Sequence, residues 1–271
     1  MPRSIRPVSC RNPYRPMTCF CRRLLFILVF FPLVTACQTT SNHTGGDAAA
    51  TKRMIGEANL MQGNYTVALK ELLEAEKLAP NDPVIHNYLG ITYKNKQMPE
   101  KAIEHFNKAL QLNPEYSIAR NNLGTVYLDK GQYDTAIDHF KSVANDILYM
   151  TPHYPLANLG WASYKKGDYA TAKSYFTQAL DIQPEFLVAL NGLGQTHLTL
   201  REYSQAIIVY EKIIKKAPRV PEFLLNLARA YEFGGNPQKA ATTLSRYLLA
   251  KPHDPKEPEI RAKIKALSQI Q

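Results

Sequence analysis

Side chains that could do chemistry are present in this 271-residue chain, but they are scattered along it. The seven histidines form no His-x-x-x-His pair and have no glutamate neighbour in a metal-binding pattern. There is no G-x-x-x-x-G-K-S/T phosphate loop and no G-x-S-x-G nucleophile elbow. His105 and His139 are 34 residues apart, each directly before a phenylalanine, and we expect both on the surface. The sequence therefore predicts no enzyme, no metal site and no cofactor.

A recurring asparagine is the more promising chemical feature. It stands two or three residues before the second member of a Leu-Gly or Leu-Ala pair, and its amide can both donate and accept hydrogen bonds. A row of such amides could hold an extended peptide, with the single tryptophan as an apolar anchor. The predicted peptide-binding residues are Asn87, Asn121, Asn122, Asn158, Trp161, Tyr164, Asn191 and Asn226. The alternative is that the asparagines cap or bridge neighbouring helices.

These positions are set by a repeat that runs through most of the chain. The pair, which is Ile-Gly in the first unit, ends at residues 56, 90, 124, 160, 194 and 228, with gaps of 34, 34, 36, 34 and 34 residues. Within each unit the apolar residues are three, four and seven apart, as on one face of a helix. A fixed period of this length indicates a solenoid of helical hairpins, because one hairpin cannot bury its apolar face alone. The asparagines would then face the concave side of the first helices.

The second helix of each unit carries a matching pattern. A small residue recurs as Ala68, Ala102, Ala136, Ala172, Ala206 and Ala240, and a large one follows four residues later as Leu72, Phe106, Phe140, Phe176, Tyr210 and Leu244. These features resemble the tetratricopeptide repeat family, whose unit is a 34-residue helix–turn–helix. The resemblance implies an all-α, right-handed α-solenoid with six hairpins over 49–252 and a C-terminal capping helix in 253–271. It also implies a protein or peptide ligand in the concave groove.

The N-terminus has the composition of a targeting segment, which we assign to residues 1–36. Its six arginines precede an apolar run over 24–34, and Cys37 follows Val34-Thr35-Ala36. That sequence resembles the lipobox of bacterial lipoproteins, which implies acylation of Cys37 and a membrane anchor. With Gln38 next, the resemblance implies the inner leaflet of the outer membrane, facing the periplasm. The alternatives are a plain secretory signal and an uncleaved anchor, and Met17 is an alternative start.

Two further segments follow from composition. Residues 37–48 are polar and contain glycine, so we expect a flexible tether between the anchor and the repeats. The net charge of +10 includes the six leader arginines, which leaves +4 for the rest, where basic and acidic residues alternate. Nucleic-acid binding is therefore not predicted, because no basic stripe supports it.

The third unit is two residues longer than the others and ends with the segment 145–152. One interpretation is a tolerated insertion between hairpins. The other is a family marker: Asp146, Leu148 and Tyr149, in six repeats behind a lipobox, resemble the pilotin lipoproteins of the type IV pilus, the PilF/PilW family. That resemblance implies a role in type IV pilus biogenesis, with an outer-membrane secretin as partner. The alternative function is an adaptor that docks cell-wall hydrolases or synthases at the envelope.

Overall fold

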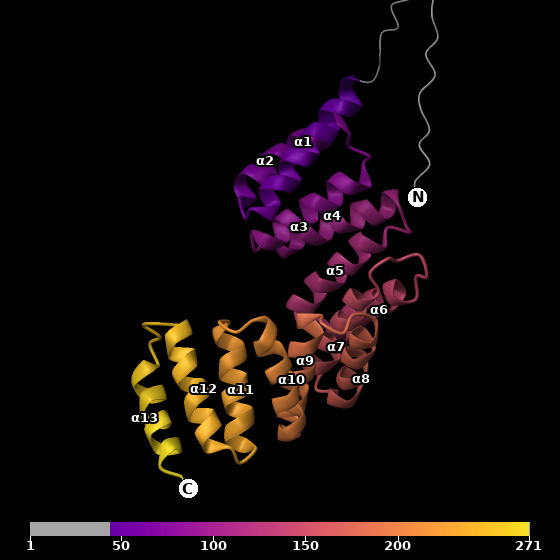
Figure 1. Ribbon diagram of the computed structural model, residues 1–271. Helices are drawn as coiled ribbons and strands as arrows, with labels where there is room; N and C mark the ends of the chain where they lie inside the picture. The colour runs from indigo at the N-terminus through magenta and orange to yellow at the C-terminus, as the bar shows by residue number, and fades with distance from the viewer. Residues whose placement is uncertain (1–43, 271) are drawn as a thin grey trace, which may run out of the picture. The chain divides into compact units, whose positions relative to one another are not determined.

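The computed structural model describes residues 44–270, which form thirteen α-helices and no strand within that range (Figure 1). Twelve of them pair in chain order as hairpins: α1 (Thr44–Met61) with α2 (Tyr65–Leu78), α3 (Pro83–Asn95) with α4 (Pro99–Leu112), α5 (Ser117–Asp129) with α6 (Tyr133–Ala144), α7 (His153–Lys166) with α8 (Tyr169–Ile182), α9 (Leu187–Thr199) with α10 (Tyr203–Lys216), and α11 (Pro221–Phe233) with α12 (Pro237–Ala250). The last helix is α13 (Glu257–Ser268). The predicted all-α solenoid of six hairpins is confirmed.

The turn inside each hairpin uses the same backbone conformation. One residue per turn has a positive φ, in the order Gly63, Gln97, Gly131, Gly167, Arg201 and Gly235. Glycine adopts this left-handed conformation without steric cost, whereas other residues are strained there by roughly 1 kcal/mol. Proline at the first helical position begins α3, α4, α11 and α12, where its missing N–H removes no helical hydrogen bond.

The core of each hairpin is a contact between a small residue on the first helix and a large one on the second. A Cβ added to Gly90, Gly124 or Gly160 would lie 2.6 Å from the nearest ring atom of Phe106, Phe140 or Phe176, respectively. The three phenylalanines are fully buried, as are the recurrent alanines of the second helices. The glycine therefore lets the two helices approach until the ring fills the space between them.

The two ends of the repeat array differ in how far the structure describes them. Helix α1 begins at Thr44, so residues 44–48, predicted as part of the tether, are helical. The leader, Cys37 and the rest of the tether lie outside the described residues. At the other end α13 packs against α12 through Ile260 and Leu267, within the segment predicted as a cap. Asp254 accepts hydrogen bonds from the Tyr247 hydroxyl and from the backbone N–H of Lys256. None of the helices between 44 and 270 is long and apolar enough to cross a membrane.

We predict that Gly192→Ala destabilises the chain, because the new Cβ would lie 2.2 Å from the Phe176 ring. Overpacking of this kind costs about 1–3 kcal/mol. Gly46→Ala is the matched control, since it is also helical and a Cβ there meets nothing within 4 Å. That control should gain up to about 1 kcal/mol from helix propensity. Urea unfolding followed by circular dichroism measures both, and equal midpoints for the two variants would contradict the packing argument.

Candidate binding surfaces

The predicted asparagine row forms hydrogen bonds between repeats. The Asn122 Nδ2 donates to Asn87 Oδ1 at 3.0 Å, and the Asn158 Nδ2 donates to Asn121 Oδ1 at 3.0 Å. These bonds join α3 to α5 and α5 to α7. Asn87 is only 2% exposed, and Asn121 is also buried. The bridging alternative therefore describes these four residues, and Asn87 offers no accessible amide to a peptide.

The row changes in the fifth repeat, where Gly192 occupies the position of Asn122 and Asn158. Asn191 instead lies beside Tyr210, whose hydroxyl is 3.4 Å from Asn191 Oδ1. Asn226 is buried in α11. Among the predicted amides, those of Asn122, Asn158 and Asn191 are half-buried and so remain partly accessible.

The two predicted aromatic anchors have different surroundings. The Trp161 ring makes edge contacts with Phe176, at 5.4 Å between centroids, and with Tyr164, at 5.7 Å. Trp161 is therefore partly used in packing the fourth hairpin. Tyr164 pairs with the hydroxyl of Thr199 at 2.9 Å and lines a hollow of about 440 Å³. The same hollow is lined by Asn226, Arg229 and other residues of α9 and α11.

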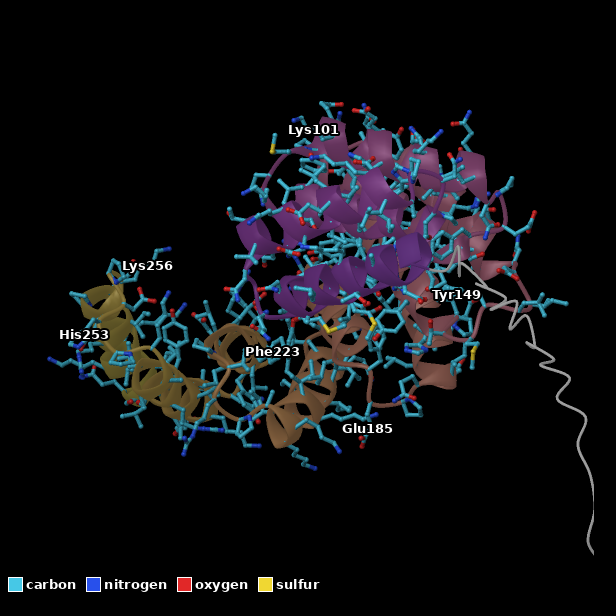
Figure 2. The ribbon with its side chains drawn as sticks, turned by 90° about the horizontal axis from the view of Figure 1, so that it is seen from above. Lys101, Tyr149, Glu185, Phe223, His253 and Lys256 are labelled. Carbon is cyan, nitrogen blue, oxygen red and sulfur yellow. The ribbon has the colours of Figure 1, made fainter. Side chains whose placement is uncertain are left out.

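The segment 145–152 exposes large apolar side chains. Ile147, Leu148 and Met150 are 95%, 83% and 94% exposed, and Tyr149 lies between them in the loop (Figure 2). The loop is held by Asp146, which accepts from the Ser117 hydroxyl at 2.5 Å and from the backbone N–H of Leu148 at 2.9 Å. These hydrogen bonds lower the pKa of the Asp146 carboxyl, so the anchoring group is ionised at neutral pH.

A hollow of about 730 Å³ lies beside this loop. Its walls come from the start of α5, the start of α7 and the loop itself, and its lining is largely apolar. Leu148, Tyr149 and Met150 contribute from the loop, and the lining includes the predicted residues Asn121 and Asn122. Ile118 and Tyr154, which the sequence reasoning missed, complete the apolar wall and are each about half exposed. For Tyr154 the available signal was the broken period, because this residue directly follows the insertion.

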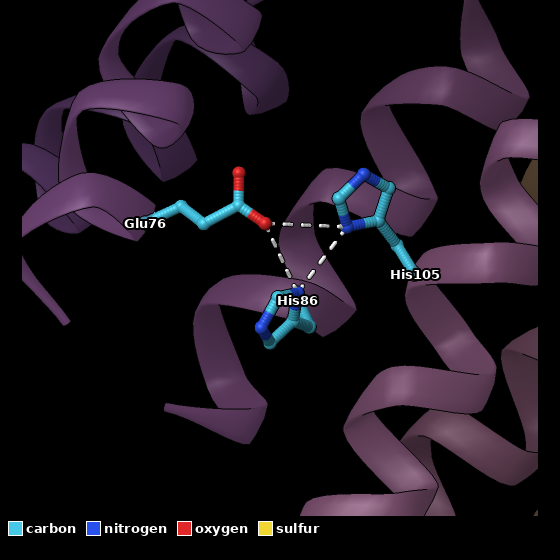
Figure 3. Close-up of side chains that lie close together, drawn as sticks. All are labelled: Glu76, His86 and His105. Carbon is cyan, nitrogen blue, oxygen red and sulfur yellow. Dashed lines mark hydrogen bonds and ion pairs between the residues drawn. The ribbon is translucent and has the colours of Figure 1, made fainter. Parts of the chain in front are cut away.

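Two histidines that we expected on the surface are packed instead, so that expectation is wrong. The His105 side chain is 14% exposed and stacks on Tyr93, with 5.2 Å between ring centroids. It also faces His86 and Glu76 (Figure 3). His139 is half-buried and stacks on Tyr127. Burial lowers the pKa of both His105 and His139, so both imidazoles are neutral at neutral pH.

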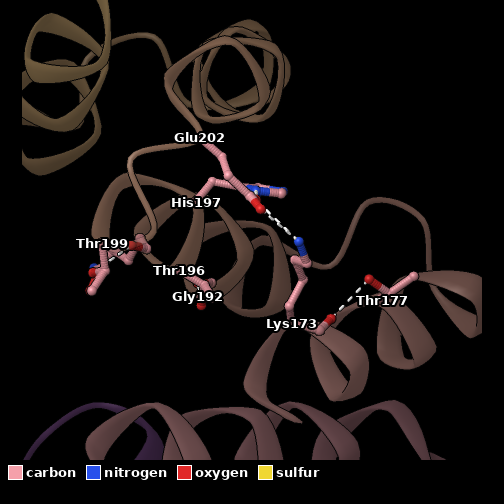
Figure 4. Close-up of polar contacts among 8 residues, drawn as sticks. Lys173, Thr177, Gly192, Thr196, His197, Thr199 and Glu202 are labelled. Atoms are coloured by element: carbon pink, nitrogen blue, oxygen red, sulfur yellow. Dashed lines mark hydrogen bonds and ion pairs between the residues drawn. The ribbon is translucent and has the colours of Figure 1, made fainter. Parts of the chain in front are cut away.

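A second polar cluster joins repeats four and five. His197, at the position of Tyr93 and Tyr231 in other repeats, pairs with Glu202 at 2.5 Å between Nδ1 and Oε2 (Figure 4). Lys173 of α8 reaches the same carboxylate at 2.9 Å. The contacts with Lys173 and His197 lower the pKa of Glu202. All three groups are satisfied by one another, so this cluster contributes to packing between the hairpins.

Several solved structures share the fold of this chain. The crystal structure of PilW, described as a widely conserved type IV pilus biogenesis factor, aligns with a TM-score of 0.73 and 21% identity, over 79% of this chain and 98% of PilW. PilF of Pseudomonas aeruginosa aligns with a TM-score of 0.70 and 22% identity, over 81% of this chain and 99% of PilF. YrrB, described as having an unusual peptide-binding site, aligns less closely, with a TM-score of 0.53.

Curated relatives match over shorter stretches. The BBSome complex member BBS4 of Bos taurus is 27% identical over 177 residues, which are 65% of this chain and 34% of BBS4. The uncharacterized protein ycf37 of Pyropia yezoensis is 32% identical over 56 residues, which are 21% of this chain and 32% of ycf37. The chain thus spans about a third of the length of each curated relative.

Family models described as tetratricopeptide repeat match residues 83–116, 105–138, and 163–222 with 203–264. Together these stretches cover more than half of the sequence. The chain belongs to the tetratricopeptide repeat family.

Proposed function

We propose that this chain is a lipid-anchored scaffold of the type IV pilus system, a pilotin-like factor that holds an outer-membrane secretin subunit during assembly. The observation that carries the proposal is the exposed apolar loop around Leu148 beside a largely apolar hollow. Tetratricopeptide repeats generally act as binding scaffolds and not as enzymes, which agrees with a protein partner.

The loop has the properties of a docking surface. Within four residues of the loop, the three large apolar side chains of Ile147, Leu148 and Met150 are exposed to water, where polar side chains are the usual choice. Contiguous apolar surface with a polar rim marks interaction sites on soluble domains. Here Asn122 and Glu115 contribute the rim, and the Asp146 hydrogen bonds hold the loop in one conformation before a partner arrives. Holding the loop in advance reduces the entropy lost on binding.

The choice of partner rests on the similarity in fold. PilW and PilF align over nearly their whole lengths, and PilW is described as a type IV pilus biogenesis factor. The sequence adds the Asp146, Leu148 and Tyr149 pattern, which falls within the exposed loop. An apolar segment of a secretin subunit is therefore the partner that we assign to the hollow.

The lipid anchor predicted at Cys37 accounts for how the scaffold would act at the membrane. Acylation of Cys37 would hold the repeats at the inner leaflet of the outer membrane, because two or more acyl chains bind a bilayer stably. A short tether then raises the local concentration of the scaffold at the surface where a secretin inserts, to roughly millimolar for short flexible linkers. A partner captured by the loop would be retained at that surface.

We predict that replacing the loop's apolar side chains abolishes partner capture. In affinity capture from detergent-solubilised envelopes, the Ile147→Ser, Leu148→Ser, Met150→Ser variant should recover at least about tenfold less secretin, since each buried apolar side chain contributes roughly 1.5–3 kcal/mol. The fold should persist, because all three residues are exposed. Met61→Ser with Leu249→Ser is the matched control, because these residues are similarly exposed but lie elsewhere.

Equal secretin recovery by the loop variant and the control would contradict the assigned surface. Recovery of cell-wall hydrolases or synthases in place of a secretin would contradict the pilus role and favour the adaptor. The recovered partner is identified by mass spectrometry in each case.

We also predict that Cys37→Ser removes the protein from the outer-membrane fraction and stops incorporation of a labelled fatty acid. The matched control is Cys21→Ser, which alters a cysteine inside the predicted leader and should leave both properties unchanged. Membrane fractionation and labelling measure the two properties together. Continued labelling of Cys37→Ser would show that the lipid anchor is assigned to the wrong residue.

A further inference from the structure

Three metal-ligating side chains that are distant in the sequence converge between the first two hairpins. Glu76 comes from the last turn of α2, His86 from the first turns of α3, and His105 from the middle of α4 (Figure 3). The two Nδ1 atoms are 3.2 Å apart, and Glu76 Oε1 is 3.5 Å from His86 Nδ1 and 3.9 Å from His105 Nδ1. The two Nδ1 atoms and Glu76 Oε1 thus lie around one point.

The tautomer of His86 is set by its second nitrogen. His86 Nε2 lies 2.8 Å from the carbonyl oxygen of Pro80, which can only accept a hydrogen bond. The Nε2 atom therefore carries the proton, and His86 Nδ1 presents a lone pair to the cluster. A backbone carbonyl that fixes the tautomer in this way is the usual second contact of a metal-binding histidine.

The spacing matches a small tetrahedral ion. Ligands at about 2.0–2.2 Å from zinc in a tetrahedral site are separated from one another by roughly 3.3–3.5 Å. The three measured separations, from 3.2 to 3.9 Å, bracket this value. Without an ion, the imidazoles can share one proton, but the carboxylate of Glu76 would then have only long contacts with both rings.

The surroundings leave access for an ion and for a fourth ligand. The side chains of His86 and His105 are 5% and 14% exposed, so their positions are fixed by packing. The cluster opens into a hollow of about 630 Å³, lined also by Glu104, Asn107 and Gln111. A water molecule or one of these side-chain oxygens can complete four-coordination, and the carboxylate of Glu76 offsets part of the charge of the ion.

The cluster occurs at only one place in the described repeats, although its position recurs. One period later His139 takes the place of His105, but Arg120 and Leu110 stand where His86 and Glu76 would be. Burial and, after it, the Arg120 charge lower the pKa of His139. Within residues 44–270 no other group of three such ligands was found.

We propose that Glu76, His86 and His105 form a zinc site that ties the first repeat to the second. Two imidazoles and a carboxylate are a donor set suited to Zn²⁺. The ion would join α2 to α3 and α4, and so stabilise the first hairpin, which among the described helices packs only against the hairpin that follows it. The role is structural and does not depend on the proposed function.

The test is zinc titration of the full chain in detergent, without a polyhistidine tag and with free cysteines blocked by N-ethylmaleimide. Calorimetry should show one site in the wild type that is lost, or weakened at least about 100-fold, in His105→Ala, since loss of even a second-shell partner costs 10–100-fold. Glu76→Gln, which keeps the shape of the side chain, should weaken the same site. His139→Ala is the matched control and should bind as the wild type does.

A second measurement guards against a folding defect in the variants. Zinc should raise the thermal midpoint of the wild type and of His139→Ala, but not that of His105→Ala, because only a ligand bound to the folded state stabilises it. Cobalt in place of zinc should give the visible absorption of a four-coordinate ion in the wild type and in His139→Ala, but not in His105→Ala. Equal zinc uptake by the wild type, His105→Ala and Glu76→Gln, or no uptake by the wild type, would overturn the proposal.

Discussion

The structure depends on one contact, which recurs in successive hairpins: a large side chain of the second helix packs onto a glycine of the first. Phe106 over Gly90 and Phe176 over Gly160 are two examples, since a Cβ added to either glycine would lie within 3 Å of the ring. Because the contact recurs with the period of the chain, it sets the distance between paired helices in each repeat. The same spacing then determines which side chains of neighbouring first helices meet, and the Asn122–Asn87 and Asn158–Asn121 bonds are its consequence.

Binding surfaces arise where this regularity is interrupted. The two extra residues in 145–152 lengthen the connection between α6 and α7, and the loop lines a hollow together with the first turns of α5 and α7. Leu148 and Met150 of that loop are exposed to water and line the hollow. The function that we propose therefore lies in a break of the repeat, and the regular repeats hold that break in place.

Much of the fold could be predicted from the sequence, because a period of 34 residues leaves few arrangements that bury every apolar face. The succession of hairpins, the buried alanines and the phenylalanine rings follow directly from that period. The candidate sites could be predicted less well from the sequence. Asn87 bonds a residue 35 positions away, and His86 meets His105 across a turn, so both contacts depend on side-chain directions that spacing alone does not give. The helical start at Thr44 was missed because its glycines, Gly45 and Gly46, read as a tether.

The central claim is that the loop around Leu148 contacts a secretin subunit at the outer membrane. The most direct measurement places a photocrosslinking amino acid at position 148 in living cells and compares it with the same amino acid at position 249, which is equally exposed. The account predicts a covalent adduct with a secretin from position 148 and none from position 249. An adduct from position 249 without one from position 148 would contradict it.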